Sequence, residues 1–556
     1  MQEKPSHAFA TLFAAHLLCG VAAIQFKVSS YEGVDPLGLL LGAEALLRSG
    51  FLSIDLFGAE VFGEYGYRIT EIGGQTYHFF PYGSVLLAVP VVALANLMGF
   101  SVADPSVDFA IQRVMVFISF LLWSIALYRI ADRFLPRWPA LLTTGTFIWS
   151  TMLVSTGLTA FWSHNFGVVF AAFAIERAIV SIETRDPRAA ALAGILVAFA
   201  YICRPTFLAL APFLVLFLAF NGWRLAAMAL AGMAAMAVIF GAFNILQFGV
   251  VMPPYYGLGR VGGPVDPVAL AGNLVSPARG LLVFMPVLVL CILSVFVRHG
   301  VVLPRAWLFL ALAWPAAHLF GISRFDHWWG GGSYGPRFMT DALPGFFLLY
   351  LIGWSAFVRF ETPVRAALFG SLVAVGIAIH AFHGLFSPWA VRWNTDPNVD
   401  QYPVYIFDWR YPQFVYNARS HARRQETHAE EYLAPLEAGA SLRDAPELFN
   451  VGMPHICDGQ DGAGEKTVCQ EIEVWVVRHW VLDGTLALDL RCGASQRVSV
   501  TIDGALVHEG PCLPDIVIDF DTAYFGKLAG PGLVTALFAS AGMSRQLPKI
   551  EAMEIK

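Results

Sequence analysis

Long apolar runs constrain the fold of this chain more than any other feature of its sequence. About twelve of them precede residue 390, and a membrane-spanning helix needs roughly 20 apolar residues. They lie near residues 8–26, 81–100, 110–128, 138–158, 162–182, 187–203, 205–222, 226–249, 281–297, 306–322, 341–358 and 366–386. Some are short and some adjoin, so we expect about 11–13 spans. Only 14% of the residues are charged, against about 25% in soluble proteins, which also indicates an all-α polytopic membrane protein.

The first apolar run, from Ala8 to Phe26, predicts a retained helix rather than a cleaved signal peptide. It is long enough to span, and no clean Ala-x-Ala cleavage site follows it. The net charge of −6 gives no reason to expect nucleic-acid binding.

Arginines between the runs predict the orientation, because cytoplasmic loops are enriched in positive charge. Four connections carry them: Arg129, Arg133 and Arg137; Arg185 and Arg188; Arg298 and Arg305; Arg359 and Arg365. Residues 28–80, 250–280 and 323–340 and the C-terminal part then face the external side of the membrane. A cytoplasmic N-terminus and an external C-terminus require an odd number of crossings, so one run, which we place within 81–132, must be re-entrant or split.

The first external loop, residues 28–80, carries two local patterns. Pro36–Gly50 predicts a short amphipathic helix lying on the membrane, in which Glu44 and Arg48, four residues apart, can pair. Tyr67–Tyr77 predicts a small hairpin that turns at Gly73-Gly74.

The chain after residue 390 is largely polar and predicts a different structure. We expect a transmembrane domain over 1–390, a connector over 391–464 and a small β-rich soluble domain over 465–556. Val498–Ile502, Asp503-Gly504 and Ala505–Glu509 form a hairpin pattern. Cys457, Cys469, Cys492 and Cys512 predict disulfides in an oxidising compartment, and four cysteines allow three pairings.

One short external loop concentrates unusual chemistry. It reads Arg324-Phe-Asp-His-Trp-Trp-Gly-Gly-Gly-Ser-Tyr-Gly-Pro-Arg337. Glycines let a backbone approach a ligand, tryptophans offer faces to a sugar ring, and arginine binds phosphate. We therefore expect a polar site at the membrane surface. Its candidate residues in this loop are Asp326, His327, Trp328, Trp329, Tyr334 and Arg337.

Further candidates lie on the same predicted side. Each has a structural alternative: a helix cap for Asp35, an interfacial anchor for Tyr82 or His164, a snorkelling side chain for Arg204, and a turn or helix start around Arg279. Asp35, just after the first span, could act as general base, and Glu32 competes for that role. The two external arginines depart from the charge rule, which favours an anionic partner.

The sequence contains no HExxH, Walker A or dinucleotide-binding pattern. Asp326 and His327 are adjacent, and adjacent residues rarely both ligate one ion. We predict no metal ligands and no required cofactor, although a divalent metal is compatible with the pattern. Rows of intramembrane carboxylates typical of ion-coupled transporters are also missing from the sequence.

These residues, in this order, resemble the GT-C superfamily of integral-membrane glycosyltransferases. The closest likeness is to the bacterial branch related to dolichyl-phosphate-mannose protein mannosyltransferases. It covers roughly residues 8–390 and rests on Asp35, Ala45–Gly50, Tyr77–Gly83, His164, Arg204–Thr206, Ser276–Gly280 and Trp328–Arg337. Many relatives carry an Asp-Glu pair where this chain has Asp35-Pro36.

The resemblance implies an inverting transfer from a polyprenyl-phosphate-linked sugar to a glycan, lipid or protein acceptor of the cell envelope. Asp35 would be the catalytic base. Arg204, Arg279, Arg337, His164 and Tyr82 would hold the donor phosphate, and Trp328, Trp329, Tyr334, Asp326, His327 and Glu32 the sugar or acceptor. Membrane lipids would surround the site, and the resemblance implies a bacterial inner membrane with the site and the C-terminal domain on the periplasmic side.

Two other function classes fit the sequence. A membrane polymerase or ligase would use a diphosphate-linked oligosaccharide. A transporter would move a lipid-linked sugar, but the unusual residues gather on one side instead of lining both ends of a path.

Overall fold

The computed structural model describes residues 7–257, 263–296, 307–359 and 362–428, together with the strands β3 to β11 between 450 and 555. The chain divides into two compact units. The first comprises Met1–Thr395 and Val404–Tyr416, and the second Asp396–Pro403 and Asn417–Lys556. Arg298, Arg305, Cys492, Cys512 and the turn Asp503-Gly504, which entered the predictions, lie outside the described residues.

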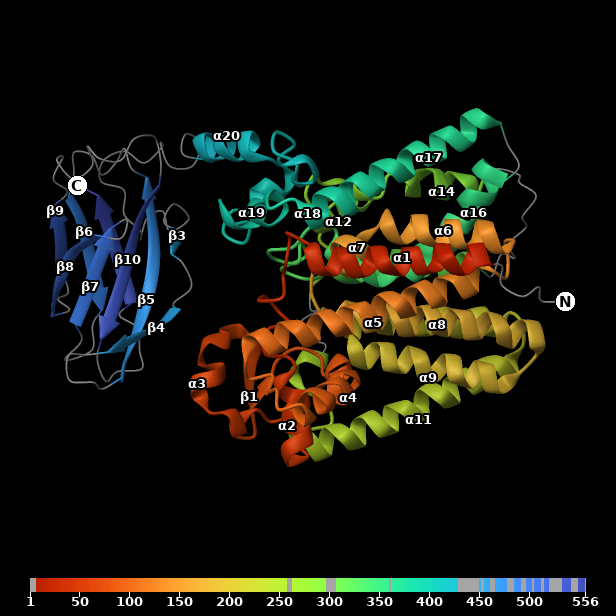
Figure 1. The fold of residues 1–556 in the computed structure, drawn as a ribbon, viewed down its shortest axis with the longest axis horizontal. Helices are drawn as coiled ribbons and strands as arrows, with labels where there is room; N and C mark the ends of the chain where they lie inside the picture. The colour runs from red at the N-terminus through yellow and green to blue at the C-terminus, as the bar shows by residue number, and fades with distance from the viewer. Residues whose placement is uncertain are drawn as a thin grey trace. The chain divides into compact units, whose positions relative to one another are not determined.

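The first unit is built almost entirely of helices (Figure 1). Its helices are α1 (His7–Phe26), α2 (Leu41–Ser49), α3 (Ala59–Phe62), α4 (Gly83–Leu97), α5 (Pro105–Ala131), α6 (Arg137–Trp149), α7 (Met152–Ser155), α8 (Ser163–Thr184), α9 (Pro187–Cys203), α10 (Leu210–Ala219), α11 (Trp223–Phe248), α12 (Pro267–Val275), α13 (Leu281–Phe284), α14 (Val287–Ser294), α15 (Trp314–Ile322), α16 (Leu343–Trp354), α17 (Pro363–Ile377), α18 (Gly384–Phe386) and α19 (Trp389–Thr395).

Within the described residues, 6 helical stretches are long and apolar enough to cross a membrane. They are Ala8–Phe26, Pro105–Ala131, Ser163–Thr184, Trp223–Phe248, Arg337–Val358 and Pro363–Phe386. Shorter apolar helices cover Gly83–Leu97, Pro187–Cys203, Pro205–Ala219 and Phe309–Ile322. The chain therefore has the helices of a membrane protein, while the expected total of about 11–13 spans and the orientation stay predictions.

Two of the predicted runs are interrupted. The run at 281–297 contains α13 and α14, separated by Met285 with φ −124° and ψ 65°. Pro286 follows, and a proline has no N–H to donate to a continuing helix. The run at 138–158 contains α6 and α7, separated by Thr151 in an extended conformation. Apolar composition alone did not reveal either break.

The helices α8, α9 and α11 lie side by side (Figure 1), and small residues bring α9 and α11 close together. A Cβ atom on Gly194 of α9 would lie 2.0 Å from the carbonyl oxygen of Ala229 in α11. A Cβ atom on Gly232 of α11 would lie 2.2 Å from the carbonyl oxygen of Ala191. Close backbone approach at small residues is a usual way to pack membrane helices.

The segment 28–80 forms a small cap at one end of the unit, opposite the end where α8 turns into α9 (Figure 1). Its hairpin consists of β1 (Ile69–Ile72) and β2 (Gln75–His78), which pair antiparallel and turn at Gly73-Gly74, as predicted. The predicted pair of Glu44 and Arg48 on α2 is also confirmed. Buried Glu44 additionally accepts from Ser101 Oγ at 2.9 Å, which ties α2 to the loop before α5.

The second unit contains α20 (Ala418–His428) and strands. These are β3 (Asn450–Val451), β4 (His455–Gln460), β5 (Lys466–Val477), β6 (Thr485–Arg491), β7 (Arg497–Ile502), β8 (Ala505–Pro511), β9 (Asp515–Asp519), β10 (Leu533–Ala541) and β11 (Lys549–Ile555). Described strands pair in the orders β3-β5-β10-β7-β8, with β4 on β5, and β11-β6-β9. The predicted domain boundaries at 390 and 465 stay predictions.

Candidate active site

Asp35 lies in the turn between α1 and α2, at the capped end of the helical unit. Helix α2 begins at Leu41 with Leu40 before it and no side-chain cap, so the helix-cap alternative for Asp35 is wrong. Its Oδ1 accepts from the hydroxyl of Tyr67 at 3.0 Å, and its Oδ2 from a guanidinium nitrogen of Arg337 at 3.2 Å. Burial and the nearby Asp35 charge raise the pKa of Tyr67, which keeps this donor protonated. The Asp35 side chain remains 18% exposed.

Arg337 reaches Asp35 from the start of the Arg337–Ala342 turn that leads into α16. Its guanidinium stands over the ring of Trp162 at 4.5 Å and that of Phe338 at 5.3 Å. Its Nε has no hydrogen-bond partner among the described residues. A carboxylate and a cation with spare hydrogen-bonding capacity therefore meet on aromatic walls, close to solvent.

Arg204 and His164 converge on a carboxylate that the sequence analysis missed. Asp341 accepts from Arg204 Nε at 2.7 Å and from Thr206 Oγ1 at 2.6 Å, and its other oxygen lies 2.6 Å from His164 Nδ1. Arg204 also donates to Ser163 Oγ at 2.9 Å. All of Arg204, His164 and Asp341 are buried. Asp341 stands at the head of an apolar run, where a buried carboxylate is unusual, and that was the available signal.

Arg279 is buried and donates to the loop that follows α15. Its Nε donates to the carbonyl oxygen of Trp329 at 2.8 Å, and its Nη2 to that of Gly331 at 3.0 Å. It also donates to the side-chain oxygens of Gln413 at 2.7 Å and Asn394 at 2.9 Å. Neither amide was a predicted site residue, and Gln413 lay in the predicted connector.

Glu32 forms an ion-pair cluster separate from Asp35. Its carboxylate lies 2.7 Å from Lys27 Nζ and 3.0 Å from Arg113 Nε, and the side chain is 5% exposed. Burial raises the pKa of Glu32, but the hydrogen bond and charge of Arg113 and those of Lys27 outweigh burial, so the net pKa lies below its usual value. Glu32 thus carries a charge that is already paired.

The remaining candidates of the loop 324–337 divide into buried and exposed groups. Trp328 is buried, and a Cβ atom on Gly272 would lie 2.0 Å from its ring. Tyr334 is buried and donates to the carbonyl oxygen of Ile379 at 2.9 Å. In contrast, Asp326 and His327 are exposed, and the His327 ring lies 4.2 Å from that of half-buried Trp329. The exposed His327 ring and the half-buried Trp329 ring therefore form one aromatic surface on this loop.

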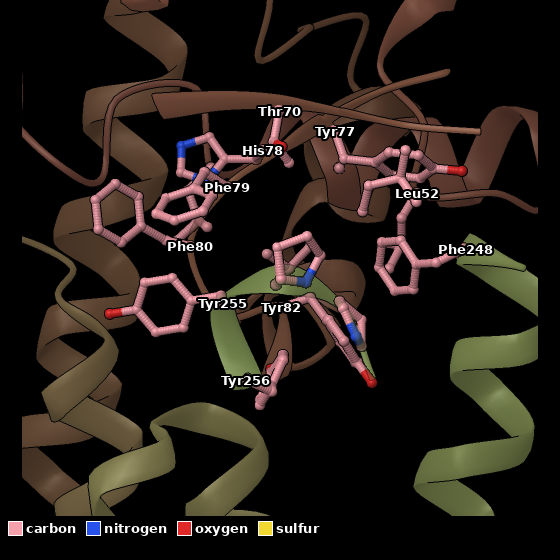
Figure 2. Close-up of a pocket in the computed structure, with 16 residues that line it drawn as sticks. Leu52, Thr70, Tyr77, His78, Phe79, Phe80, Tyr82, Phe248, Tyr255 and Tyr256 are labelled. Atoms are coloured by element: carbon pink, nitrogen blue, oxygen red, sulfur yellow. The ribbon is translucent and has the colours of Figure 1, made fainter. Parts of the chain in front are cut away.

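Tyr82 lines an aromatic pocket beneath the hairpin (Figure 2). Its hydroxyl bonds Asn244, and the rings of Phe79, Phe80 and Tyr255 form another wall. The pocket offers water about 30 Å³ of accessible space, enough for roughly two water molecules. His78 also lines it, and burial lowers the pKa of His78 to about 4, so the imidazole is neutral. The side chains that line this pocket carry no positive charge to pair with a phosphate.

Comparisons with known proteins found no match in sequence and a weak similarity in structure. No family model matches the chain, and no curated protein matches its sequence. Among solved structures, the chain is similar to arabinosyltransferase EmbB from Mycobacterium smegmatis, with 13% identity and a TM-score of 0.36. The match covers 100% of this chain and 65% of that chain, so our chain spans less than two thirds of that protein. A similarity this low carries no argument about function.

Among the described residues, no group of three or more His, Cys, Asp or Glu could hold a metal ion.

Proposed function

We propose that this protein is an inverting membrane glycosyltransferase of the GT-C type. It moves a sugar from a polyprenyl-phosphate donor to a periplasmic glycan, lipid or protein acceptor. The contact between Asp35 and Arg337 carries the proposal, because it joins a partly exposed carboxylate to a cation next to apolar helices. The sequence resemblance to GT-C enzymes supports the same class.

Asp35 serves as the general base in this proposal. Each carboxylate oxygen can accept more than one hydrogen bond, so Asp35 can bind an acceptor hydroxyl while Tyr67 and Arg337 hold it. The acceptor oxygen gives its proton to Asp35 and forms a bond to the anomeric carbon. The bond from that carbon to the phosphate oxygen breaks, and the phosphate leaves with the electron pair. Attack opposite the leaving group inverts the configuration.

Arg337 stabilises the departing phosphate. Its Nε and remaining N–H groups can donate to an anion while one nitrogen holds Asp35. Arg204 is balanced by Asp341, and Arg279 holds backbone carbonyls, so we assign both to support of the site. The exposed ring of His327 and the half-buried ring of Trp329 offer a surface on which the sugar or acceptor stacks.

Transfer assays with the purified full chain test this function. We expect the Asp35→Asn variant to transfer sugar from a polyprenyl-phosphate donor at least about 100-fold more slowly than the unaltered protein. Asp104→Asn is the matched control, because Asp104 is an exposed carboxylate that caps α5. Its rate should stay unchanged.

Other outcomes would overturn the proposal. A folded Asp35→Asn protein with full activity contradicts the assigned base. Turnover of diphosphate-linked oligosaccharide alone indicates a polymerase or ligase. Movement of lipid-linked sugar across vesicles without any transfer indicates a transporter.

A further inference from the structure

We infer that Gln413, together with Arg279 and Asn394, positions Arg337 against Asp35. These three buried side chains are called the amide clamp below. They come from three separate segments, two of them after the last candidate span. The kinetic part of the inference rests on the proposed function, whereas its structural part does not.

The oxygen and the nitrogen of the Gln413 amide both form hydrogen bonds with the backbone of the loop 324–337. Its Oε1 accepts from the backbone N–H of Gly335 at 3.0 Å and from Arg279 at 2.7 Å. Its Nε2 donates to the carbonyl oxygen of Ser333 at 2.9 Å. The side chain is fully buried, so an apolar replacement would take the partner from the buried N–H of Gly335.

Arg279 extends the same grip along the loop. Through its bonds to the carbonyl oxygens of Trp329 and Gly331, the amide clamp holds the backbone at alternate residues from 329 to 335. The ring of Trp393 lies 5.4 Å from the Arg279 guanidinium. A loop held at four successive alternate positions has little freedom left.

Glycines leave this loop with few conformational preferences of its own, so its backbone needs contacts from elsewhere to hold one conformation. Gly330, Gly331 and Gly335 have φ values of 75°, 64° and 63°, a region that other residues rarely adopt. Gly335 directly precedes the Pro336-Arg337 step, and the Arg337 N–H donates to the Gly335 carbonyl oxygen at 2.9 Å. Because Gln413 holds Gly335, it fixes the backbone position from which the Arg337 side chain extends.

The amide clamp also contacts the Asp35 side of the ion pair. Asn394 Nδ2 lies 3.4 Å from the hydroxyl of Tyr31, which belongs to the segment that carries Asp35. The Tyr31 ring lies 6.1 Å from that of Trp162, on which Arg337 stacks. The amide clamp thus contacts both the loop that precedes Arg337 and the segment that carries Asp35.

The structural test measures the coupling between Asp35 and Arg337 without any substrate. The changes in melting temperature caused by Asp35→Asn, Arg337→Gln and both together are compared in the full-length protein. We expect clear non-additivity when Gln413 is present and its loss when Gln413→Leu is added. Gln247→Leu is the matched control, because Gln247 holds the N–H of Leu52 and the carbonyl oxygen of Gly50 elsewhere.

Two results would overturn the inference. One is coupling that persists in Gln413→Leu, and the other is coupling that disappears equally in Gln247→Leu. If Gln413→Leu does not fold, Gln413→Glu serves instead. It keeps the oxygen toward Gly335 but removes the donor to Ser333, and we expect it to weaken the coupling.

The kinetic test separates this inference from the proposed function. Gln413→Leu should lower kcat by up to about 100-fold, as small misplacements of a catalytic group can do. Adding it to Arg337→Gln should cause no further loss if Gln413 acts through Arg337. Additive losses would overturn the positioning role, whereas unimpaired transfer by Asp35→Asn would overturn the proposed function and leave the structural test standing.

Discussion

Arg337 donates to the carboxylate of Asp35 at 3.2 Å, although the two residues are 302 positions apart in the chain. The pair joins the turn after α1 to the segment that starts α16. Two loops far apart in the sequence therefore meet at one ion pair.

Loss of the Arg337 charge should weaken the use of an anionic donor. We expect Arg337→Gln to lower kcat/KM for a polyprenyl-phosphate sugar by about 100-fold, since an aimed cation stabilises charge on the leaving phosphate. Initial rates at varied donor concentration measure the effect. Arg324→Gln is the control, because Arg324 is exposed and donates to the carbonyl oxygen of Gly263. Equal losses in both variants would contradict the prediction.

Asp341 should matter first for stability. Asp341→Asn leaves the buried charge of Arg204 without its counter-ion, and breaking a buried ion pair costs about 3–5 kcal/mol. Thermal unfolding of the detergent-solubilised protein should show a clear drop in melting temperature. Thr340→Val should have little effect, because the Thr340 hydroxyl has no hydrogen-bond partner among the described residues. An unchanged melting temperature for Asp341→Asn would refute this role.

Glu32 should contribute stability that depends on pH. Its pKa in the folded protein lies below the usual 4.5, so the carboxylate stabilises the fold fully above that pH. The contribution is lost as the pH falls through the lowered value. Glu32→Gln should therefore unfold at a lower temperature than the unaltered protein at pH 7, and the difference should shrink below pH 4.5. A difference that does not vary with pH would exclude ion pairing as its cause.

The close crossing of α9 and α11 predicts a severe effect of a single methyl group. Gly194→Ala places a Cβ atom 2.0 Å from a backbone oxygen of α11, which forces the helices apart. Such overpacking typically costs about 1–3 kcal/mol. Gly145→Ala in α6 meets nothing within 4 Å and should be neutral or stabilising. Comparable melting temperatures for the two variants would show that the crossing adapts.

The strand register directs the disulfide prediction to one pair. Cys457 of β4 and Cys469 of β5 are opposite partners in an antiparallel ladder. Opposite Cα atoms in such a ladder are about 4.5–5.5 Å apart, within the range that a disulfide spans. Peptide mapping without reduction should find these two cysteines linked. Their recovery as free thiols from oxidised, folded protein would count against the pairing.

Local patterns were sufficient for features that depend on near neighbours. The hairpin at Gly73-Gly74 follows from turn chemistry, and the contact between Glu44 and Arg48 follows from helical spacing. The 6 long apolar helices likewise follow from hydrophobic length. Each of these signals is contained within a short segment, where the chain's own geometry decides which side chains meet.

The partners within the site required the tertiary structure. The sequence pointed to Asp35, Arg204 and Arg337. It did not show which charges meet, because those contacts join residues 137 and 302 positions apart. Asp341 was hidden in an apolar run, and Gln413 in a segment expected to be a connector. Hydrogen bonding and charge pairing act over a few ångströms of space, and only the packing of the helices sets those distances.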